Sequence, residues 1–274
     1  MDTFSYEEYF QNDNTLFAFS YTDPENNEIE HTHEFNELVI VDKGCGVQVF
    51  NGDLYFIQEG DIFLVKEGDR HFYNELGTLK LMNLQINTRY RFQYLQQFEA
   101  ILEQTYVKNG ENFIWLMPKD KDFCVNLIRR IPQIYRQPAP IACFQAETAF
   151  MQILSTIMLS HSSIQHSSTQ YKIRNILIYL QRNYAQEIDW LVLSDLFFIT
   201  YKTMTRKLKE LTGMTPVNYL NRLRLLSARD KLRHSDDSVT DIAGLCGFNN
   251  SDYFAKCYKK HFALSPSDER KNYL

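Results

Sequence analysis

The chain has 274 residues, of which 44% are hydrophobic and 14% aromatic, so it is long enough for one large domain or two ordinary ones with packed cores. No apolar run reaches the ~18 to 20 residues of a membrane-spanning helix, and the acidic N-terminus lacks the basic and apolar regions of a secretory signal. Five scattered cysteines without metal-type spacing are typical of thiols in a reducing cytoplasm.

The net charge of −5 hides an uneven distribution. Residues 171–274 carry 17 Lys and Arg against 11 Asp and Glu, a net charge of +6, which leaves −11 for the rest of the chain. A basic C-terminal third on an acidic body indicates that one end meets a polyanion, although ordinary surface variation would give the same imbalance.

The first ~90 residues of the chain are predicted to form short β-strands. Runs rich in Val, Ile, Phe and Tyr occupy residues 37–41, 46–51, 54–58 and 61–65. The predicted turns between and after them are Lys43-Gly44, Asn51-Gly52-Asp53, Glu59-Gly60-Asp61 and Glu67-Gly68-Asp69. This spacing predicts an antiparallel sandwich or barrel.

After Arg89 the pattern becomes helical. Apolar residues recur every three or four positions, which predicts helices near Phe92–Leu102, Lys121–Tyr135 and Ile141–Leu159. The apolar stripe expected to pack in a core or a dimer interface is Phe123, Leu127, Ile131 and Ile134. A polar, Ser-rich segment follows, so the predicted domains are 1–160 and 171–274, joined by a linker at 161–170.

The C-terminal third contains a weak repeat at an offset of 50 residues, Thr200–Pro216 and Asn250–Pro266. Each copy starts with a residue suited to cap a helix, has apolar residues four apart, carries basic residues at matching outer positions, and ends in Thr-Pro or Ser-Pro. Each copy also follows a shorter predicted helix across a tight turn, at Leu191–Phe198 and Val239–Cys246. This is the pattern of a helix-turn-helix, and a plain helical bundle does not demand it.

One long helix, Val217–His234, is predicted between the two copies. At 1.5 Å per residue it is roughly 27 Å long. A rigid helix of that length could hold two recognition helices about one DNA turn apart, ~34 Å, on one face of the duplex. The sequence therefore predicts a sequence-specific DNA-binding regulator whose partner is double-stranded DNA.

These residues also resemble a known family. Residues 238–270 (SVTDIAGLCGFNNSDYFAKCYKKHFALSPSDER) resemble the second helix-turn-helix of the AraC/XylS transcription regulators, and residues 212–225 (TGMTPVNYLNRLRL) resemble the junction that precedes it. Base contacts are expected on the exposed N-terminal half of each recognition helix: Lys202, Thr203 and Arg206, then Asn250, Ser251 and Asp252 with Lys256 behind them. Arg206 is the predicted bidentate guanine contact, whereas Asp252 has a second interpretation as an acid favoured by a helix N-terminus.

The N-terminal strands contain His31, His33, Glu37 and Gly44, a spacing that resembles the first cupin motif; a looser second motif contains Gly60, Gly68 and His71. The predicted fold class is therefore α+β multidomain. An N-terminal cupin-like antiparallel β-barrel with helices is followed by an all-α domain with two helix-turn-helix motifs joined by a linker helix.

Three uses of the barrel residues remain open. His31, His33, Glu37 and His71 form a polar sugar-binding wall, hold a divalent metal that assists effector binding, or make structural hydrogen bonds only. The predicted companions are Arg70, Tyr73 and Trp115, because sugar pockets pair polar groups with aromatic faces. No cofactor and no catalysis are expected of such a regulator. The rival interpretation is a metal-dependent cupin enzyme fused to a DNA-binding module.

Both halves, at residues 31–73 and 219–248, resemble the L-rhamnose-responsive activators of enteric bacteria within this family. The resemblance implies a cytoplasmic homodimer that binds L-rhamnose, dimerises through the helices of its first domain and switches on rhamnose catabolic genes. It also implies an RNA polymerase contact at Asp241, whose other interpretation is a helix N-terminal acid. The sequence departs from the pattern at Lys202, Asn250 and Asp252, which puts the operator sequence in doubt. A regulator of another effector is the alternative.

Overall fold

The computed structural model describes residues 2–10, 15–22, 29–97, 100–101, 113–160 and 169–273. It divides into two compact units. One comprises Met1–Gly46 and Ile57–Ile164, the other Val47–Phe56 and Gln165–Leu274. Most of the predicted linker lies outside the described residues, and its last two residues, Thr169 and Gln170, already begin a helix.

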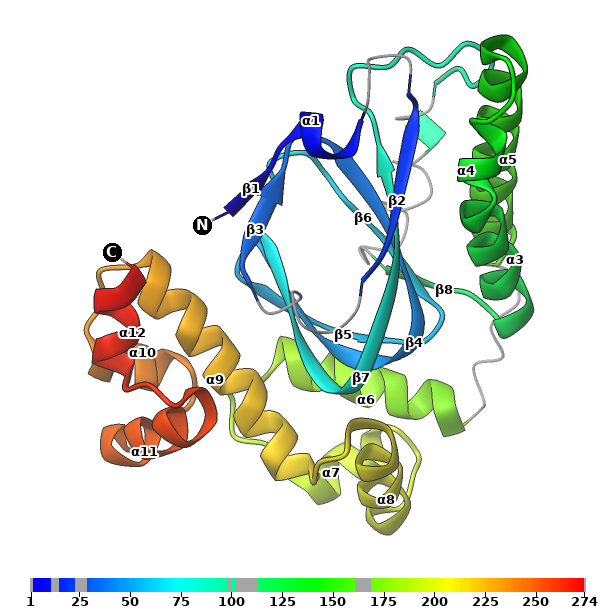
Figure 1. Ribbon diagram of the computed structural model, residues 1–274. Helices are drawn as coiled ribbons and strands as arrows, with labels where there is room; N and C mark the ends of the chain where they lie inside the picture. The colour runs from blue at the N-terminus through cyan, green and yellow to red at the C-terminus, as the bar shows by residue number, and fades with distance from the viewer. Residues whose placement is uncertain are drawn as a thin grey trace. The chain divides into compact units, whose positions relative to one another are not determined.

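One sheet, curled into a half-barrel, forms the centre of the N-terminal unit (Figure 1). Its strands are β1 (Asp2–Phe4), β2 (Phe17–Thr22), β3 (His31–His33), β4 (Asn36–Phe50), β5 (Asp53–Gln58), β6 (Asp61–Val65), β7 (His71–Ile86) and β8 (Phe113–Trp115). The order across the sheet is β1-β3-β7-β4-β6-β8, with β2 also paired to β7 and β5 to β4.

The predicted strands and fold class are confirmed, with one correction to the antiparallel pattern. β1 and β3 run parallel, with Asp2 opposite His31. Parallel neighbours need a crossover connection, and here the chain passes through the short helix α1 (Tyr6–Tyr9) and through β2 before it returns as β3.

The predicted turn at Lys43-Gly44 is wrong, because β4 runs unbroken through it. Gly44 has a φ of +80°, and a Cβ at this position would lie 1.5 Å from the carbonyl oxygen of Thr78. The glycine is needed where β4 and β7 approach each other closely, not where the chain reverses. The other three predicted turns are present.

Successive residues of β4 face opposite sides of the sheet, as the two-residue period of a strand requires. Leu38 and Ile40 belong to the apolar core shared with the helices of this unit. Glu37, on the other side, contacts His33 and Gln85. The sheet therefore has one apolar face and one face that carries polar side chains.

Three helices cover the apolar face: α3 (Pro118–Arg129), α4 (Ile131–Ile134) and α5 (Ala139–Ser160) (Figure 1). Pro132 lies at the start of α4, so the single helix predicted at Lys121–Tyr135 is two helices. Three members of the predicted stripe are buried, but Phe123 is 45% exposed and lies outside the core.

The helix predicted at Phe92–Leu102 is present only in part: residues 91–97 are irregular, whereas Ala100 and Ile101 are helical and the Ile101 backbone nitrogen donates to the Gln97 carbonyl at 3.0 Å. The backbone N–H groups of residues 93–95 are held by a side chain instead. The Glu147 carboxylate of α5 accepts hydrogen bonds from the backbone nitrogens of Gln93, Tyr94 and Leu95, at 2.7 to 2.8 Å.

The expectation that no segment is apolar enough for a membrane span also needs correction. By length and composition, α5 passes that test, with a mean hydropathy of 1.2 over its most apolar window. Serine, threonine and glutamine interrupt its apolar runs, but Glu147 is its one charged residue. Its buried side chains, Phe150 and Ile157 among them, lie in the core of the N-terminal unit, as those of a core helix do.

The described residues 169–273 of the C-terminal unit are helical, as predicted. Its helices are α6 (Thr169–Arg182), α7 (Trp190–Leu196), α8 (Tyr201–Thr212), α9 (Pro216–His234), α10 (Val239–Leu245), α11 (Ser251–Phe262) and α12 (Pro266–Tyr273). The long central helix α9 contacts α6, α8, α10 and α12. It therefore serves as the common support of both helix pairs, α7–α8 and α10–α11.

Candidate functional site

The two repeat copies fold as matching helices. Thr200 caps α8 by accepting from the backbone nitrogen of Thr203 at 3.3 Å, and Asn250 caps α11 by accepting from that of Tyr253 at 2.8 Å. The apolar residues four apart, Met204 with Leu208 and Phe254 with Tyr258, are completely buried. Each helix therefore buries one face and presents the other to solvent.

A tight turn precedes each of these helices, and each turn contains one residue in the left-handed backbone conformation. The residue type differs between the two turns. Gly247, after α10, has a φ of +84°, and a Cβ there would lie 2.6 Å from the carbonyl oxygen of Ala185. Phe198, after α7, has a φ of +50° and is 85% exposed. Both turns set the angle at which the following helix leaves, which a helix-turn-helix requires.

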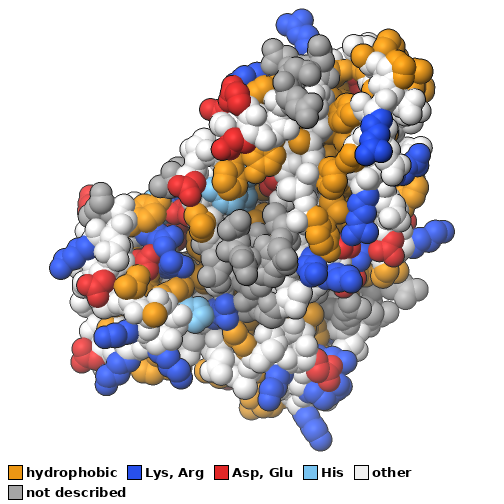
Figure 2. Space-filling view, viewed as in Figure 1, with side chains coloured by type: hydrophobic (Ala, Val, Ile, Leu, Met, Phe, Trp, Pro, Cys, Tyr) orange, Lys and Arg blue, Asp and Glu red, His pale blue; other side chains and the backbone are white. Residues whose placement is uncertain are grey.

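The residues predicted to contact bases lie on the solvent side of these helices. Lys202, Arg206, Asn250, Ser251, Asp252 and Lys256 are exposed, and Thr203 is half-buried beside its cap. Figure 2 shows Lys and Arg side chains on the surface of the C-terminal unit.

Arg206 is engaged within its own helix. Its Nη1 lies 2.6 Å from Oε1 of Glu210, and Lys207 Nζ lies 2.7 Å from the other carboxylate oxygen. Such exposed pairs at i,i+4 and i,i+3 spacing are weak, ~0.3 to 0.5 kcal/mol, so the guanidinium can exchange this partner for another at little cost.

Asp241 takes part in a helix cap at the start of α10. The Ser238 hydroxyl donates to the Asp241 carboxylate at 2.6 Å, and the Asp241 backbone nitrogen donates to the Ser238 oxygen at 3.1 Å. The residue is exposed. The cap therefore gives a structural reason for an acid at this position. The contact with RNA polymerase stays a prediction.

In the N-terminal unit, three histidine rings from β3 and the start of β7 converge. The ring centroids of His31 and His71 are 4.3 Å apart, those of His33 and His71 4.7 Å, and those of His31 and His33 5.3 Å. Glu37 Oε2 lies 3.6 Å from His33 Nε2. The structure thus brings together the four residues that the sequence singled out.

Burial determines the charge of this cluster. Desolvation, assisted by the neighbouring His31, lowers the pKa of His33 to about 3, and desolvation also lowers the pKa of His31 and of His71. Burial raises the pKa of Glu37 to about 7, against the effect of hydrogen bonds from Gln85 and Asn83. The cluster therefore contains three neutral imidazoles beside a carboxyl group that changes protonation near neutral pH.

Buried polar atoms around the cluster lack hydrogen-bond partners among the described residues. They are His33 Nδ1, both ring nitrogens of His71, the Tyr73 hydroxyl, Asn83 Oδ1 and Gln85 Oε1. Buried polar groups are nearly always satisfied by protein, water or ligand, so this interior is suited to a polar molecule or an ion. Asn83 and Gln85 were not predicted as site residues; the signal that could have found them is their alternation with Leu84 and Ile86 along β7.

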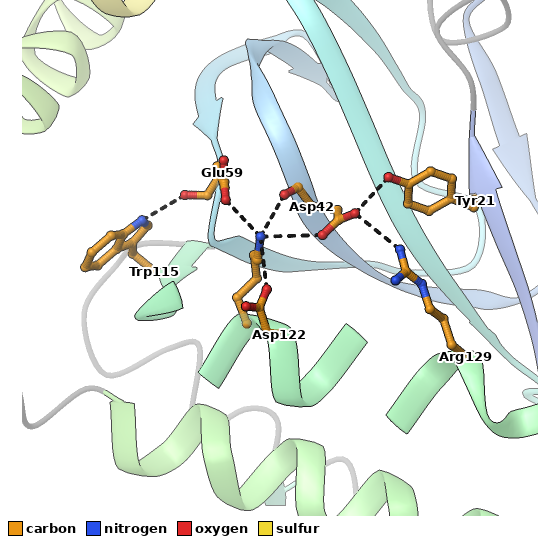
Figure 3. Close-up of polar contacts among 7 residues, drawn as sticks. Tyr21, Asp42, Glu59, Trp115, Asp122 and Arg129 are labelled. Atoms are coloured by element: carbon orange, nitrogen blue, oxygen red, sulfur yellow. Dashed lines mark hydrogen bonds and ion pairs between the residues drawn. The ribbon is translucent and has the colours of Figure 1, made fainter. Parts of the chain in front are cut away.

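Two predicted companions lie elsewhere. Arg70, just before β7, forms an ion pair with the buried carboxylate of Glu30. Trp115 lies on β8, which β7, β4 and β6 separate from β3 in the sheet order. Its indole nitrogen donates to the Glu59 carbonyl at 3.0 Å, and Figure 3 shows it beside the ion-pair network of α3.

Comparisons with known proteins cover both units. Residues 15–154 match the AraC-like ligand binding domain, and residues 193–272 match the helix-turn-helix domain. The chain is 34% identical over 266 residues to the HTH-type transcriptional activator RhaS of Escherichia coli O1:K1 / APEC, which covers 96% of this chain and 95% of the relative. It is 33% identical over 244 residues to the HTH-type transcriptional activator RhaS of Enterobacter sp. (strain 638), with 88% and 87% coverage. A solved AraC-type regulator from Chromobacterium violaceum is 25% identical, has a TM-score of 0.37, and covers 38% of this chain and 94% of its own.

Proposed function

The chain belongs to the AraC family of transcription regulators, and on that premise we propose that it is a DNA-binding activator that responds to L-rhamnose and switches on rhamnose catabolic genes. The observation that carries the DNA-binding part is the pair of capped helices, α8 and α11, held in matching register on α9. Each presents an exposed N-terminal half suited to the major groove.

For the DNA contacts, we assign base reading to Lys202, Thr203 and Arg206 on α8. On α11 the corresponding residues are Asn250, Ser251, Asp252 and Lys256. The side-chain oxygen of Asn250 already caps α11. The main contribution of Asn250 is therefore to fix where the helix begins. Phosphate contacts from the remaining lysines position the protein but do not read sequence.

For the effector, the polar interior of the half-barrel is the binding site. L-rhamnose offers several adjacent hydroxyl groups, which can donate to and accept from His31, His33, Glu37, His71 and Tyr73. The unpartnered atoms of Asn83 and Gln85 extend this wall. Arg70 would contribute only after it leaves Glu30, so it is a secondary member of the site.

For assembly, we propose a homodimer formed through α3 and α5. Phe123, Phe144 and Met158 are about half exposed on these helices, and a groove of ≈ 200 Å³ lies between them, lined in part by Leu127 and Gln152. Figure 2 shows hydrophobic side chains at the surface along these helices. A second copy would cover apolar surface that water now meets.

The protein acts in the cytoplasm, where it recruits RNA polymerase through Asp241 and performs no catalysis. Rhamnose binding favours one of two arrangements of the DNA-binding unit by its differential affinity for them.

The test is binding of the purified protein to its own upstream intergenic DNA, with and without L-rhamnose, at fixed salt because phosphate contacts make affinity salt-dependent. D-glucose is the control sugar, and Arg206→Ala is the control for the DNA contact. Tighter specific binding with L-rhamnose alone supports the proposal. Specific binding whose affinity L-rhamnose does not change supports the DNA-binding assignment and contradicts the effector assignment.

A further inference from the structure

A tight turn connects α6 to α7, the first helix of the first helix-turn-helix. It comprises residues 183–186 and is closed by a hydrogen bond from the Gln186 backbone nitrogen to the Asn183 carbonyl at 3.0 Å. The chain then reaches Asp189, whose side chain caps α7. The position of the 183–186 turn therefore determines where the first helix-turn-helix begins.

Arg224 of α9 holds this turn by two of its backbone carbonyl groups. Its Nε donates to the Tyr184 carbonyl at 2.8 Å, and its Nη2 donates to the Gln186 carbonyl at 2.9 Å. Because the guanidinium is a planar fork, the two bonds together fix the direction of the turn as well as its distance from α9.

The second helix-turn-helix approaches the same turn closely. A Cβ at Gly247, in the turn between α10 and α11, would lie 2.6 Å from the Ala185 carbonyl oxygen and 3.0 Å from the Ala185 Cα. Only a residue without a side chain allows this approach. The guanidinium carbon of Arg224 lies 5.9 Å from the ring centre of the adjacent Phe248, at the outer limit of a cation–π contact. Three successive carbonyl groups of the 183–186 turn are thus engaged by α9 or by the second helix-turn-helix.

Ser227, three residues further along α9, forms a second link between the same elements. Its hydroxyl oxygen lies 2.7 Å from the Tyr184 hydroxyl oxygen, and the Cys246 thiol at the end of α10 donates to it at 3.7 Å. Ser227 is buried, at 2% exposure, so water does not compete for these bonds. The 183–186 turn, α9 and the end of α10 are therefore joined at two separate points.

We propose that Arg224, Ser227 and the 183–186 turn form a clasp that fixes the separation and relative orientation of α8 and α11. Figure 1 shows the pairs α7–α8 and α10–α11 at opposite ends of α9, so the clasp adds a direct connection between two motifs that α9 otherwise supports separately.

The consequence concerns which DNA the protein accepts. Two recognition helices held rigidly can enter the major groove only at segments of one spacing and one helical phase. Helices that are already in place also lose less freedom on binding. Arg224 and Gly247 are therefore positioning residues for DNA reading. The proposal rests on the DNA-binding part of the proposed function and is independent of the effector.

A distance measurement tests the clasp without DNA. Lys209 and Lys259 hold matching exposed positions on α8 and α11, and each is replaced by a keto amino acid that carries a spin label. Double electron–electron resonance then gives the distribution of label separations in the full-length protein, mixed with excess unlabelled protein so that only separations within one chain are measured. We expect a single narrow distribution with Arg224 present and a broader one in Arg224→Ala. A distribution that stays equally narrow in Arg224→Ala overturns the proposal.

A spacing series measures the consequence for DNA reading. The operator in the upstream intergenic DNA is located by footprinting, and one base pair is inserted between the segments that α8 and α11 protect. The insertion turns one segment by roughly 35° about the duplex axis relative to the other. We expect it to weaken wild-type binding by about 10-fold or more, because at least one base contact is lost. Arg224→Ala should lose less than about 3-fold, because helices that are free to move adjust to the new spacing.

Two further variants separate positioning from a direct contact with DNA. Arg224→Lys keeps the positive charge but not the planar fork, so it should tolerate the insertion as Arg224→Ala does. The exposed Asn218→Ala on the same helix is the control and should leave the label separations and the spacing preference unchanged. An equal loss of affinity at both spacings in Arg224→Ala, restored by Arg224→Lys, would make Arg224 a phosphate contact and overturn the proposal.

If Arg224→Ala does not fold, Tyr184→Phe replaces it, because that substitution removes only the hydroxyl group bonded to Ser227. A broader distribution together with tolerance of the inserted base pair supports the clasp, and a wild-type spacing preference in this variant contradicts it. A wild-type protein that binds no specific duplex removes the proposed function, whereas the label separations still decide this proposal.

Discussion

Gly213 and Ala263 hold equivalent positions, 50 residues apart, at the C-terminal caps of the two recognition helices. Both adopt the left-handed conformation, with φ values of +71° and +59°. Glycine adopts this conformation without penalty, whereas the Cβ of alanine meets the backbone. The second helix-turn-helix therefore carries a local strain that the first lacks.

We expect Ala263→Gly to stabilise the C-terminal unit by about 0.5 to 1 kcal/mol, because the relief of strain exceeds the entropy that glycine adds to the unfolded chain. Urea unfolding followed by circular dichroism measures the change. Gly213→Ala is the reciprocal control and should destabilise by a similar amount, since a Cβ there meets no neighbouring atom and only the backbone is strained. A loss of stability in Ala263→Gly would contradict the argument.

Glu147 is predicted to be the most sensitive polar residue of α5. It is completely buried, and its carboxylate accepts three backbone hydrogen bonds from residues 93–95. Glu147→Ala leaves three N–H groups unsatisfied, so a loss of at least ~3 kcal/mol is expected. Thermal unfolding of the variant measures the loss. The exposed Gln145→Ala on the same helix should change stability little, and equal effects of the two substitutions would refute the capping role.

Lys121 joins α3 to the sheet. Its Nζ is bonded to the Asp42 carbonyl at 2.9 Å and to Glu59 at 2.8 Å, and Figure 3 shows Tyr21 and Arg129 converging on the same Asp42 carboxylate. Lys121→Met removes a positive charge from beside this nearly buried carboxylate. The free energy of unfolding is expected to fall by ~3 kcal/mol or more. Chemical denaturation measures it against Lys119→Met, an exposed neighbour on the same helix. A variant as stable as wild type would show that the network contributes nothing.

The sequence was sufficient for the features that depend on local periodicity. Paired caps and apolar residues at four-residue spacing identified α8 and α11, because a helix that buries one face must repeat in this way. The sequence was insufficient where a residue far away in the chain determines the local backbone conformation. Gly44 resembled a turn residue, but its conformation is set by the approach of Thr78. Likewise, residues 92–97 have a helical pattern, yet the Glu147 carboxylate satisfies their backbone in an irregular form.

The same limit applies to the site. The histidines were visible because their spacing is unusual, and they do converge. Asn83 and Gln85 join them from β7, within the region predicted as strands, but neither residue was singled out by a motif. Arg70 was predicted because sugar pockets pair polar groups with aromatic faces, but its side chain forms an ion pair with Glu30.

Acid is predicted to destabilise the C-terminal unit through His261. Desolvation, with Arg222 and Arg229, lowers the pKa of His261 to about 4, whereas an unfolded histidine titrates near ~6.5. The unfolded state then binds more protons between these values, so the stability present above pH 6.5 falls as the pH drops towards 4. Urea midpoints at pH 7, 6 and 5 should fall less in His261→Gln than in wild type. Parallel slopes for the two proteins would rule the residue out.

Glu210 is predicted to weaken DNA binding by competing for Arg206. In the free protein its carboxylate holds Arg206 and Lys207, and on DNA it brings a negative charge towards the phosphates. Glu210→Gln should therefore tighten operator binding several-fold at low salt, with a smaller gain at high salt, because both contributions are screened.

Arg206→Ala should cost ~1 to 3 kcal/mol on the operator and relax the preference at one base pair. In an Arg206→Ala background, Glu210→Gln should keep only the gain from the removed charge, and fluorescence anisotropy over a salt series measures all four proteins. Equal gains in both backgrounds would show that Glu210 acts on the phosphates and does not restrain Arg206.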